Sequence, residues 1–190
     1  FNEENDSKDP PGPPRTERCY MQKPLPSERW EDGKLVVASD GACPYQSVDH
    51  ELRRSAVQLH YGVDHPANVS WPTHGMVQGA QSAEVAGAMR WAQWSWSPTK
   101  LLTDSQYVYD TVRRFLSFGP CFCKPPKFHR RAWNSFCMAI EAKGRDNFDV
   151  EKVAAHVEWE QVKDRSEAEV ERWLRNDAAD KLSLIHISEP

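Results

Sequence analysis

Four acidic residues lie either directly after an apolar segment or within a pattern of helical spacing. Asp104 follows the apolar run LLT, and Asp40 follows VVAS. Glu84 opens a stretch with helical spacing, and Asp180 lies near the end of another. Burying an ionised carboxylate is costly, and a bound divalent cation is one partner that offsets the cost. Two of the acids also have an ordinary explanation: Asp104 or Ser105 can cap a helix, and Glu84 can interact with a helix N-terminus.

Hydrophobic periodicity predicts the elements that must position these acids. Continuous or alternating apolar residues predict strands over residues 34–39, 54–61, 69–77, 99–104 and 150–156. Apolar residues at helical spacing predict helices over residues 81–94, 106–118, 128–143 and 171–183, the first capped by Gln81 or Ser82. Pro72 places the third strand at an edge of the sheet. A helix between the fourth and fifth strands predicts a parallel crossover, so we expect an α/β fold with a mixed sheet.

The chain is mildly acidic, with 24 Lys and Arg against 28 Asp and Glu in 190 residues and a formal net charge of −4. A chain of this length forms one compact domain. Its overall charge does not attract nucleic acid, which therefore requires a local basic patch. Basic residues do surround the proline-containing loop at residues 119–127: Arg113, Arg114, Lys124, Lys127, His129, Arg130 and Arg131. The alternative is that they form a solvated helix face.

Both ends of the chain differ in composition from its middle. Residues 1–32 are polar and rich in proline, which predicts an extended linker before a domain at residues 33–183. Residues 184–190 (LIHISEP) fit no upstream element and do not look native, so we exclude them from the fold. Because the first residue is Phe, we expect a piece of a longer reading frame.

The five cysteines are odd in number and irregular in spacing, which predicts reduced thiols in an intracellular protein of the cytoplasm or nucleus. Zinc is an alternative use for some of them, but the spacing fits no common site: Cys121, Cys123, His129 and Cys137. No apolar run approaches the roughly 20 residues of a membrane span, so we expect no membrane partner.

Four motifs, in order, resemble those of the type 1 ribonuclease H family. VVASDGAC (36–43) matches the family's first-strand acid and its following glycine, and QSAE (81–84) matches its helix-borne glutamate. TDSQYV (103–108) matches the signature T-D-S-x-Y-V, and NDAADKL (176–182) matches N-x-x-A-D-x-L. The resemblance covers about residues 34–183. It implies a five-stranded mixed sheet in the order 3-2-1-4-5, with helices on both faces.

The resemblance implies an endonuclease that hydrolyses the RNA strand of RNA/DNA hybrids with two Mg²⁺ ions, which Mn²⁺ can replace. Asp40 would bridge the two ions, Glu84 and Asp104 would complete one site, and Asp180 would complete the other. Such an ion pair, roughly 4 Å apart, activates a water and neutralises the leaving oxygen, and hard carboxylate oxygens suit it. No His/Cys cluster favours zinc instead.

His156 matches the position of the family's mobile histidine, which is thought to assist proton transfer and product release. The ordinary explanation is a surface histidine near a strand end. The sequence also departs from the family here, because residues 157–175 form a charged segment without glycine. Arg175 replaces the usual glycine before Asn176.

The resemblance also implies substrate contacts. Cys43, Gln81, Gln106 and Asn176 match positions around the RNA 2′-hydroxyl, the group that distinguishes RNA from DNA. Phosphates of the hybrid would meet basic residues near the proline loop: Lys124, Lys127, Arg130 and Arg131. This loop is shorter than the family's basic protrusion, so a linked domain such as a reverse transcriptase could supply part of the binding. We expect a monomer.

Two other functions remain open from the sequence. The first is a nucleic-acid-binding module of ribonuclease H type that has lost activity, as part of a reverse transcriptase polyprotein. The second is another nuclease or integrase of the same fold, against which the motifs TDSQYV and NDAAD argue.

Overall fold

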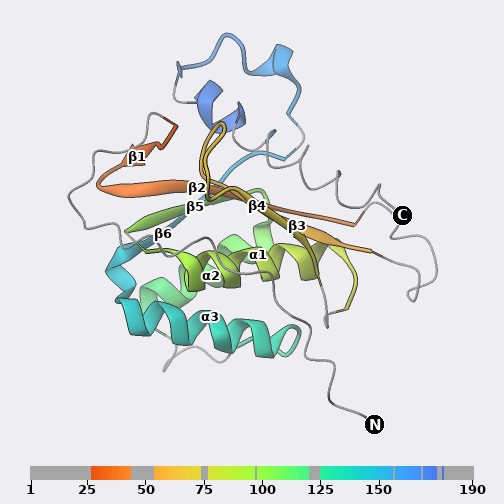
Figure 1. The fold of residues 1–190 in the computed structure, drawn as a ribbon, viewed down its shortest axis with the longest axis vertical. Helices are drawn as coiled ribbons and strands as arrows, with labels where there is room; N and C mark the ends of the chain where they lie inside the picture. The colour runs from red at the N-terminus through yellow and green to blue at the C-terminus, as the bar shows by residue number, and fades with distance from the viewer. Residues whose placement is uncertain are drawn as a thin grey trace.

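The computed structural model describes residues 27–43, 54–73, 77–96, 98–119, 125–155, 157–167, 169–174 and 177. Within these residues, six strands form one mixed sheet with the order β4-β3-β2-β5-β6, and β1 pairs with β2 (Figure 1). The strands are β1 (Trp30–Glu31), β2 (Lys34–Ala42), β3 (Ala56–His60), β4 (Val69–Pro72), β5 (Thr99–Thr103) and β6 (Phe148–Lys152). Apart from β1, this order is the one that the resemblance implied.

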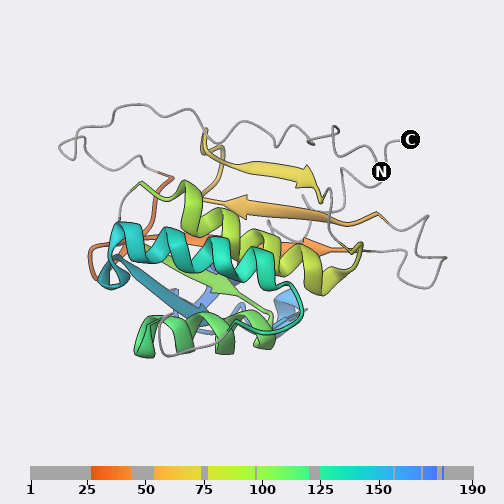
Figure 2. The same cartoon turned by 90° about the horizontal axis from the view of Figure 1, so that it is seen from below.

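Three longer helices lie on the same side of the sheet in the described structure (Figures 1 and 2). They are α1 (Ala80–Trp94), α2 (Gln106–Phe118) and α3 (Arg130–Lys143). Short 3-10 turns, η1 (Arg145–Asn147) and η2 (Trp159–Gln161), precede and follow β6. Helical residues 169–174 lie on the other side of the sheet (Figure 1). None of the described helices is long and apolar enough to cross a membrane.

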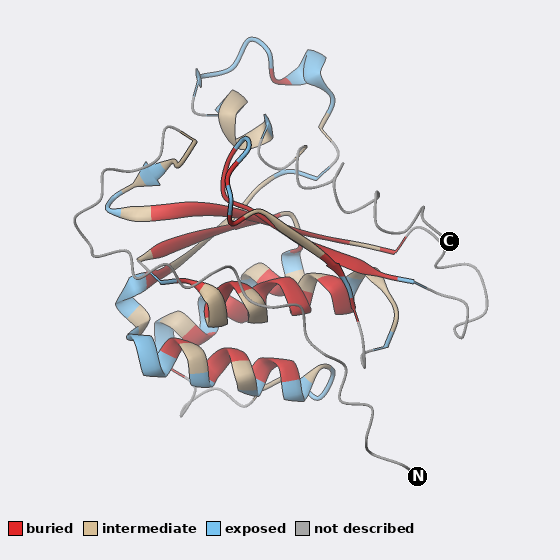
Figure 3. Cartoon of the chain, in the orientation of Figure 1, coloured by how far each residue is buried: buried red, intermediate tan, exposed pale blue. Residues whose placement is uncertain are grey.

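The core lies between the sheet and these three helices, as the buried colouring of Figure 3 shows. Trp91 of α1 and Trp133 of α3 are fully buried, and their rings pack on Phe136. The Trp91 indole N–H donates to Thr99 Oγ1 at 3.0 Å, and that hydroxyl donates to the Leu35 carbonyl. A buried indole needs such a partner, and here the bonds also join α1 to β5 and β2.

The central strands are parallel and in a register that aligns their carboxyl ends. Ser39 of β2 pairs with Thr103 of β5, which pairs in turn with Lys152 of β6. The Val153 amide extends this row by donating to the Thr103 carbonyl at 3.0 Å. The predicted parallel crossover is confirmed, and residues that follow these three positions meet at one edge of the sheet.

Several predicted boundaries are wrong. The first strand was expected to end at residue 39, before the turn signal Asp40-Gly41, but β2 continues through both residues to Ala42. The last strand was expected at residues 150–156. It spans Phe148–Lys152, so it begins two residues earlier and ends four residues earlier. The third strand ends at Pro72, at the predicted sheet edge. Strand β1 lies inside the stretch that we expected to be linker.

The start of α1 also differs from the prediction. Its N-cap is Gly79, with no side-chain cap, and not Gln81 or Ser82. Glu84 is therefore the fifth helical residue and lies beyond the first turn. The effect of a helix N-terminus is confined to the first turn, so it does not explain the placement of Glu84.

An ion-pair network ties the segment after β6 to the sheet, on the face away from α1. Glu31 of β1 accepts bonds or ion pairs from Arg29, Lys100 and Arg172 at 2.6, 2.9 and 3.5 Å. Arg172 also pairs with Glu151 of β6 at 3.2 Å. Burial raises the pKa of Glu31, but the cations around it outweigh that effect and lower the pKa overall. Arg172, in the charged segment that departs from the family pattern, is thus tied to β1 and β6 by ion pairs.

Gly41 provides a test of how closely β2 packs on α1. A Cβ at Gly41 would lie 2.7 Å from the Ala83 carbonyl carbon and closer still to the Glu84 nitrogen. These are backbone atoms, so the strand and helix would have to separate. We expect Gly41→Ala to reduce the free energy of unfolding by about 1–3 kcal/mol, as overpacking does, measured by urea denaturation. At the matched control Gly79→Ala, an added Cβ meets nothing within 4 Å; an equal loss there would contradict this interpretation.

Candidate carboxylate site at the edge of the sheet

Asp40 and Asp104 lie on neighbouring parallel strands at the carboxyl edge of the sheet. Each comes directly after a member of the Ser39–Thr103 pair. Adjacent strands lie about 4.8 Å apart, so the register brings the two backbones side by side at the acids. Asp40 is only 7 % exposed and Asp104 is half-buried. Two acids that are far apart in sequence are therefore neighbours in the structure.

Glu84 joins these two acids from α1. The contact of Gly41 with the α1 backbone places Glu84 next to the strand that carries Asp40. From the other side, Ser105 Oγ donates to Glu84 Oε2 at 2.5 Å. Ser105 is also the N-cap of α2, because its Oγ accepts from the Val108 amide. The cap of α2 is thus Ser105, and capping does not account for Asp104.

The electrostatics of the site follow from this geometry. Burial raises the pKa of Glu84, and the Asp104 charge pushes it in the same direction. The Ser105 hydrogen bond and the positive charge of Lys152 oppose the shift without cancelling it. Burial and the neighbouring Asp104 charge therefore keep the pKa of Glu84 above its ordinary value.

The donor chemistry of this edge suits a hard divalent cation, since Asp40, Glu84 and Asp104 all offer carboxylate oxygens. In the described part of the chain, however, no three His, Cys, Asp or Glu side chains form a group that could hold a metal ion. Asp180 and His156, two further predicted site residues, lie outside the described residues.

The predicted substrate contacts fall into three groups. Cys43 directly follows β2 and is buried. Gln81 and Gln106 are exposed near the starts of α1 and α2, and Gln106 donates to Asp110 at 2.9 Å. Both α2 and α3 begin at the end of the sheet where β2 and β5 finish (Figure 2). Three basic residues near the start of α3 are exposed: Lys127, Arg130 and Arg131. The remaining two lie outside the described residues: Lys124 and Asn176.

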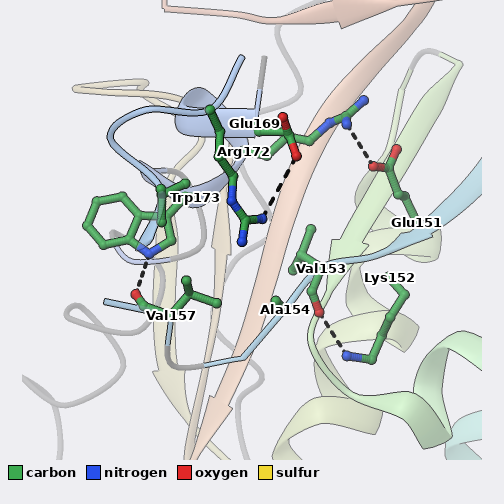
Figure 4. Close-up of a pocket in the computed structure, with 10 residues that line it drawn as sticks. Glu151, Lys152, Val153, Ala154, Val157, Glu169, Arg172 and Trp173 are labelled. Atoms are coloured by element: carbon green, nitrogen blue, oxygen red, sulfur yellow. Dashed lines mark hydrogen bonds and ion pairs between the residues drawn. The ribbon is translucent and has the colours of Figure 1, made fainter. Parts of the chain in front are cut away.

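A pocket of about 170 Å³ opens beside the end of β6 (Figure 4). Its apolar wall includes Val153, Val162 and Trp173, and its charged wall includes Lys152 and Arg172. The Trp173 indole N–H donates to the Val157 carbonyl at 2.5 Å, and its ring packs against Trp159. The chain is thus anchored at Val153 and again at Val157, on either side of the position of His156.

Sequence reasoning missed Lys152 and the role of Ser105. From the sequence, Lys152 is only part of a predicted strand, and Ser105 is only a possible helix cap within a motif. The motif TDSQYV contained Ser105, but no sequence signal showed that its hydroxyl would reach Glu84. Lys152 becomes visible only through its register with Thr103.

Among known proteins, only solved structures match this chain. No protein-family model and no curated protein matches this chain. Solved structures do match: the PFV RNase H domain has a TM-score of 0.55 at 18% identity, covering 79% of this chain and 94% of that one. The chain has the ribonuclease H fold. The predicted fold is confirmed, with one additional short strand.

Two further solved structures show the same ribonuclease H fold. A foamy viral protease-reverse transcriptase in complex with dsDNA matches with a TM-score of 0.55 at 19% identity, covering 80% of this chain and 93% of that chain. The native prototype foamy virus protease-reverse transcriptase matches with a TM-score of 0.51 at 21% identity, covering 79% of this chain. The match spans 21% of that longer chain.

The raised pKa of Glu84 predicts a pH effect on stability within this ribonuclease H fold. A carboxyl group whose pKa is higher in the folded state stabilises the fold at low pH, and this stabilisation is lost as pH rises through the raised pKa. Glu84→Gln removes the ionisation. In a chelator at mildly alkaline pH, we expect Glu84→Gln to raise Tm by about 2–4 °C, the shift that roughly 1 kcal/mol produces in a domain of this size.

Thermal melts monitored by circular dichroism across a pH series check this expectation. Glu141→Gln is the matched control, because Glu141 is an exposed carboxylate on α3. A lower Tm for Glu84→Gln than for wild type at every pH would contradict this prediction, in which the ionised Glu84 carboxylate is buried and repelled by Asp104.

Proposed function

We propose that this chain is a metal-dependent endonuclease that hydrolyses the RNA strand of RNA/DNA hybrids, leaving 5′-phosphate and 3′-hydroxyl ends. The observation that carries the proposal is the register that places Asp40 and Asp104 side by side, with Glu84 joined to them through Gly41 and Ser105. The ribonuclease H fold supports it, since three of the four sequence motifs, those with Asp40, Glu84 and Asp104, meet at this edge.

In this proposal, Asp40, Glu84, Asp104 and Asp180 hold two Mg²⁺ ions, which Mn²⁺ can replace. Bound there, the ions would supply a water that is nucleophilic near neutral pH and neutralise the leaving oxygen. Ser105 orients Glu84 by donating to Oε2, which leaves Oε1 for another partner. The burial of Asp40 keeps bulk water from screening the charge on which the reaction depends.

The remaining predicted residues have supporting roles in the same proposal. His156 transfers a proton and assists product release. Val153 and Val157, before and after it in sequence, are each held by a hydrogen bond. Cys43, Gln81, Gln106 and Asn176 contact the hybrid near the RNA 2′-hydroxyl. Phosphates of the hybrid bind to exposed cations beside α3: Lys124, Lys127, Arg130 and Arg131. The enzyme acts inside cells as a monomeric domain linked to a reverse transcriptase of a retroelement.

A second candidate is a nucleic-acid-binding module without catalytic activity. It is favoured by the finding that the described residues contain no group of three metal-ligating side chains. The two candidates differ in one respect that can be measured, which is metal-dependent cleavage.

Substitution of Asp104 tests the enzyme directly. We expect wild-type protein to cut a labelled RNA/DNA hybrid in Mg²⁺, with duplex DNA and duplex RNA left intact. Asp104→Asn keeps the size of the side chain and removes its charge, so the rate should fall about 100-fold or more, the scale for losing one group that stabilises transition-state charge. Asp146→Asn, an exposed aspartate in η1 at the opposite edge, is the control. An intact, folded wild type that does not cleave any hybrid would support the binding module.

Substitution of His156 tests the proton-transfer role. General acid–base catalysis contributes about 100-fold or more, so we expect His156→Ala to cleave at a reduced but detectable rate. His129→Asn is the control, because His129 is the left-handed N-cap of α3 and Asn tolerates that conformation. Single-turnover rates equal to wild type in His156→Ala would exclude the assigned role.

A further inference from the structure

Lys152 is a cation at the carboxyl edge that none of the four motifs includes. It is the last residue of β6 and pairs with Thr103, the residue before Asp104. Side chains alternate along a strand, and Val150 of β6 packs in the core beneath the helices. Lys152 therefore points to the side of the sheet that carries α1 and Glu84, while Glu151 points to the other side.

The contacts of Lys152 differ from those of the other cations near β6. Lys100 and Arg172 each form ion pairs with Glu31 and Glu151 on the opposite face. Lys152 Nζ instead donates to the carbonyl of Val153 at 2.8 Å, and it forms no ion pair with the described residues. An ammonium group has three donors, so this contact leaves its charge and part of its donor capacity for another group.

The charge of Lys152 already acts on the carboxylate site. It opposes the upward shift of the Glu84 pKa, although the two groups are not within ion-pair distance. Lys152 also lines the pocket between β6 and the segment at residues 157–173 (Figure 4). The same residue thus acts on Glu84 and borders the pocket.

We propose that Lys152 binds a phosphate oxygen of the nucleic acid next to the carboxylate site. This inference rests on the proposed function, in which the charges of four carboxylates and two divalent ions balance. A phosphodiester that enters such a neutral site is attracted by one additional fixed cation. Lysine is a common point-charge ligand of phosphate, and the sheet strand fixes the backbone from which the flexible Lys152 stem extends.

Binding without cleavage tests this proposal. In the Asp104→Asn background, which keeps the hybrid intact, fluorescence anisotropy measures Kd for a labelled RNA/DNA hybrid over a salt series. Lys152→Met removes the charge and keeps an unbranched side chain. We expect Kd to rise about 5- to 10-fold at low salt, and the slope of log K against log salt to fall by about 1, as for one lost phosphate contact. Lys152→Arg should restore most of the affinity.

Lys34→Met is the matched control, because Lys34 is the first residue of β2 and lies about six residues, or roughly 20 Å, from Asp40 along the strand. It removes the same charge at the opposite edge. Thermal melts check that each variant is folded. If Lys152→Met does not fold, the affinity and salt slope of Lys152→Arg are compared with those of the parent protein instead.

Three results would overturn the proposal: an unchanged Kd and salt slope in Lys152→Met, an equal change in Lys34→Met, or no hybrid binding by the parent protein. The proposed enzymatic function is tested separately. If the wild type binds hybrid but does not cleave it, the nuclease assignment fails while the phosphate contact stands. If the wild type cleaves and Lys152→Met binds as tightly as its parent, only the Lys152 proposal fails.

Discussion

The close approach of Gly41 to α1 is the constraint on which the site depends. With no Cβ at Gly41, strand β2 lies against the backbone of Ala83 and Glu84. Gly87, about one turn further along α1, lies against the side chains of Ser39 and Val57. Two glycines, one on each element, thus fix both the distance and the rotation of the helix over the strand. Asp40 and Glu84 become neighbours as a consequence of this packing.

Charge is separated between the two faces of the sheet by the alternation of side chains. Glu151 points to the face where it pairs with Lys100 and with Arg172, which belongs to the segment after β6. Lys152, the next residue, points to the face of the helices and acts on Glu84. One strand therefore stabilises the fold on one side and contributes charge to the candidate site on the other. The ion pairs on the first face are partly buried and contribute to stability. Exposed pairs such as Glu141 with Arg145 contribute little to stability.

The sequence predicted the types of the elements well and their ends poorly. The apolar stripe of α3 and the parallel crossover follow from local periodicity, and both are confirmed. Asp40-Gly41 resembled a turn because glycine favours turns, but the glycine is needed for packing and β2 continues past it. Gln81 and Ser82 are suitable caps, yet the helix begins at Gly79, where the chain enters from the preceding segment. Tertiary contacts outweighed local preference at each of these ends.

The sequence by itself determined the order of the acids and the class of the fold, because motif spacing and hydrophobic periodicity are local properties. Only the tertiary structure decided that Ser39, Thr103 and Lys152 share one row. Strand register depends on side chains packing between elements that are distant along the chain, and a slip of one residue would turn Lys152 to the other face. The same packing brought the Ser105 hydroxyl to Glu84, an interaction that neither residue's neighbours in sequence could indicate.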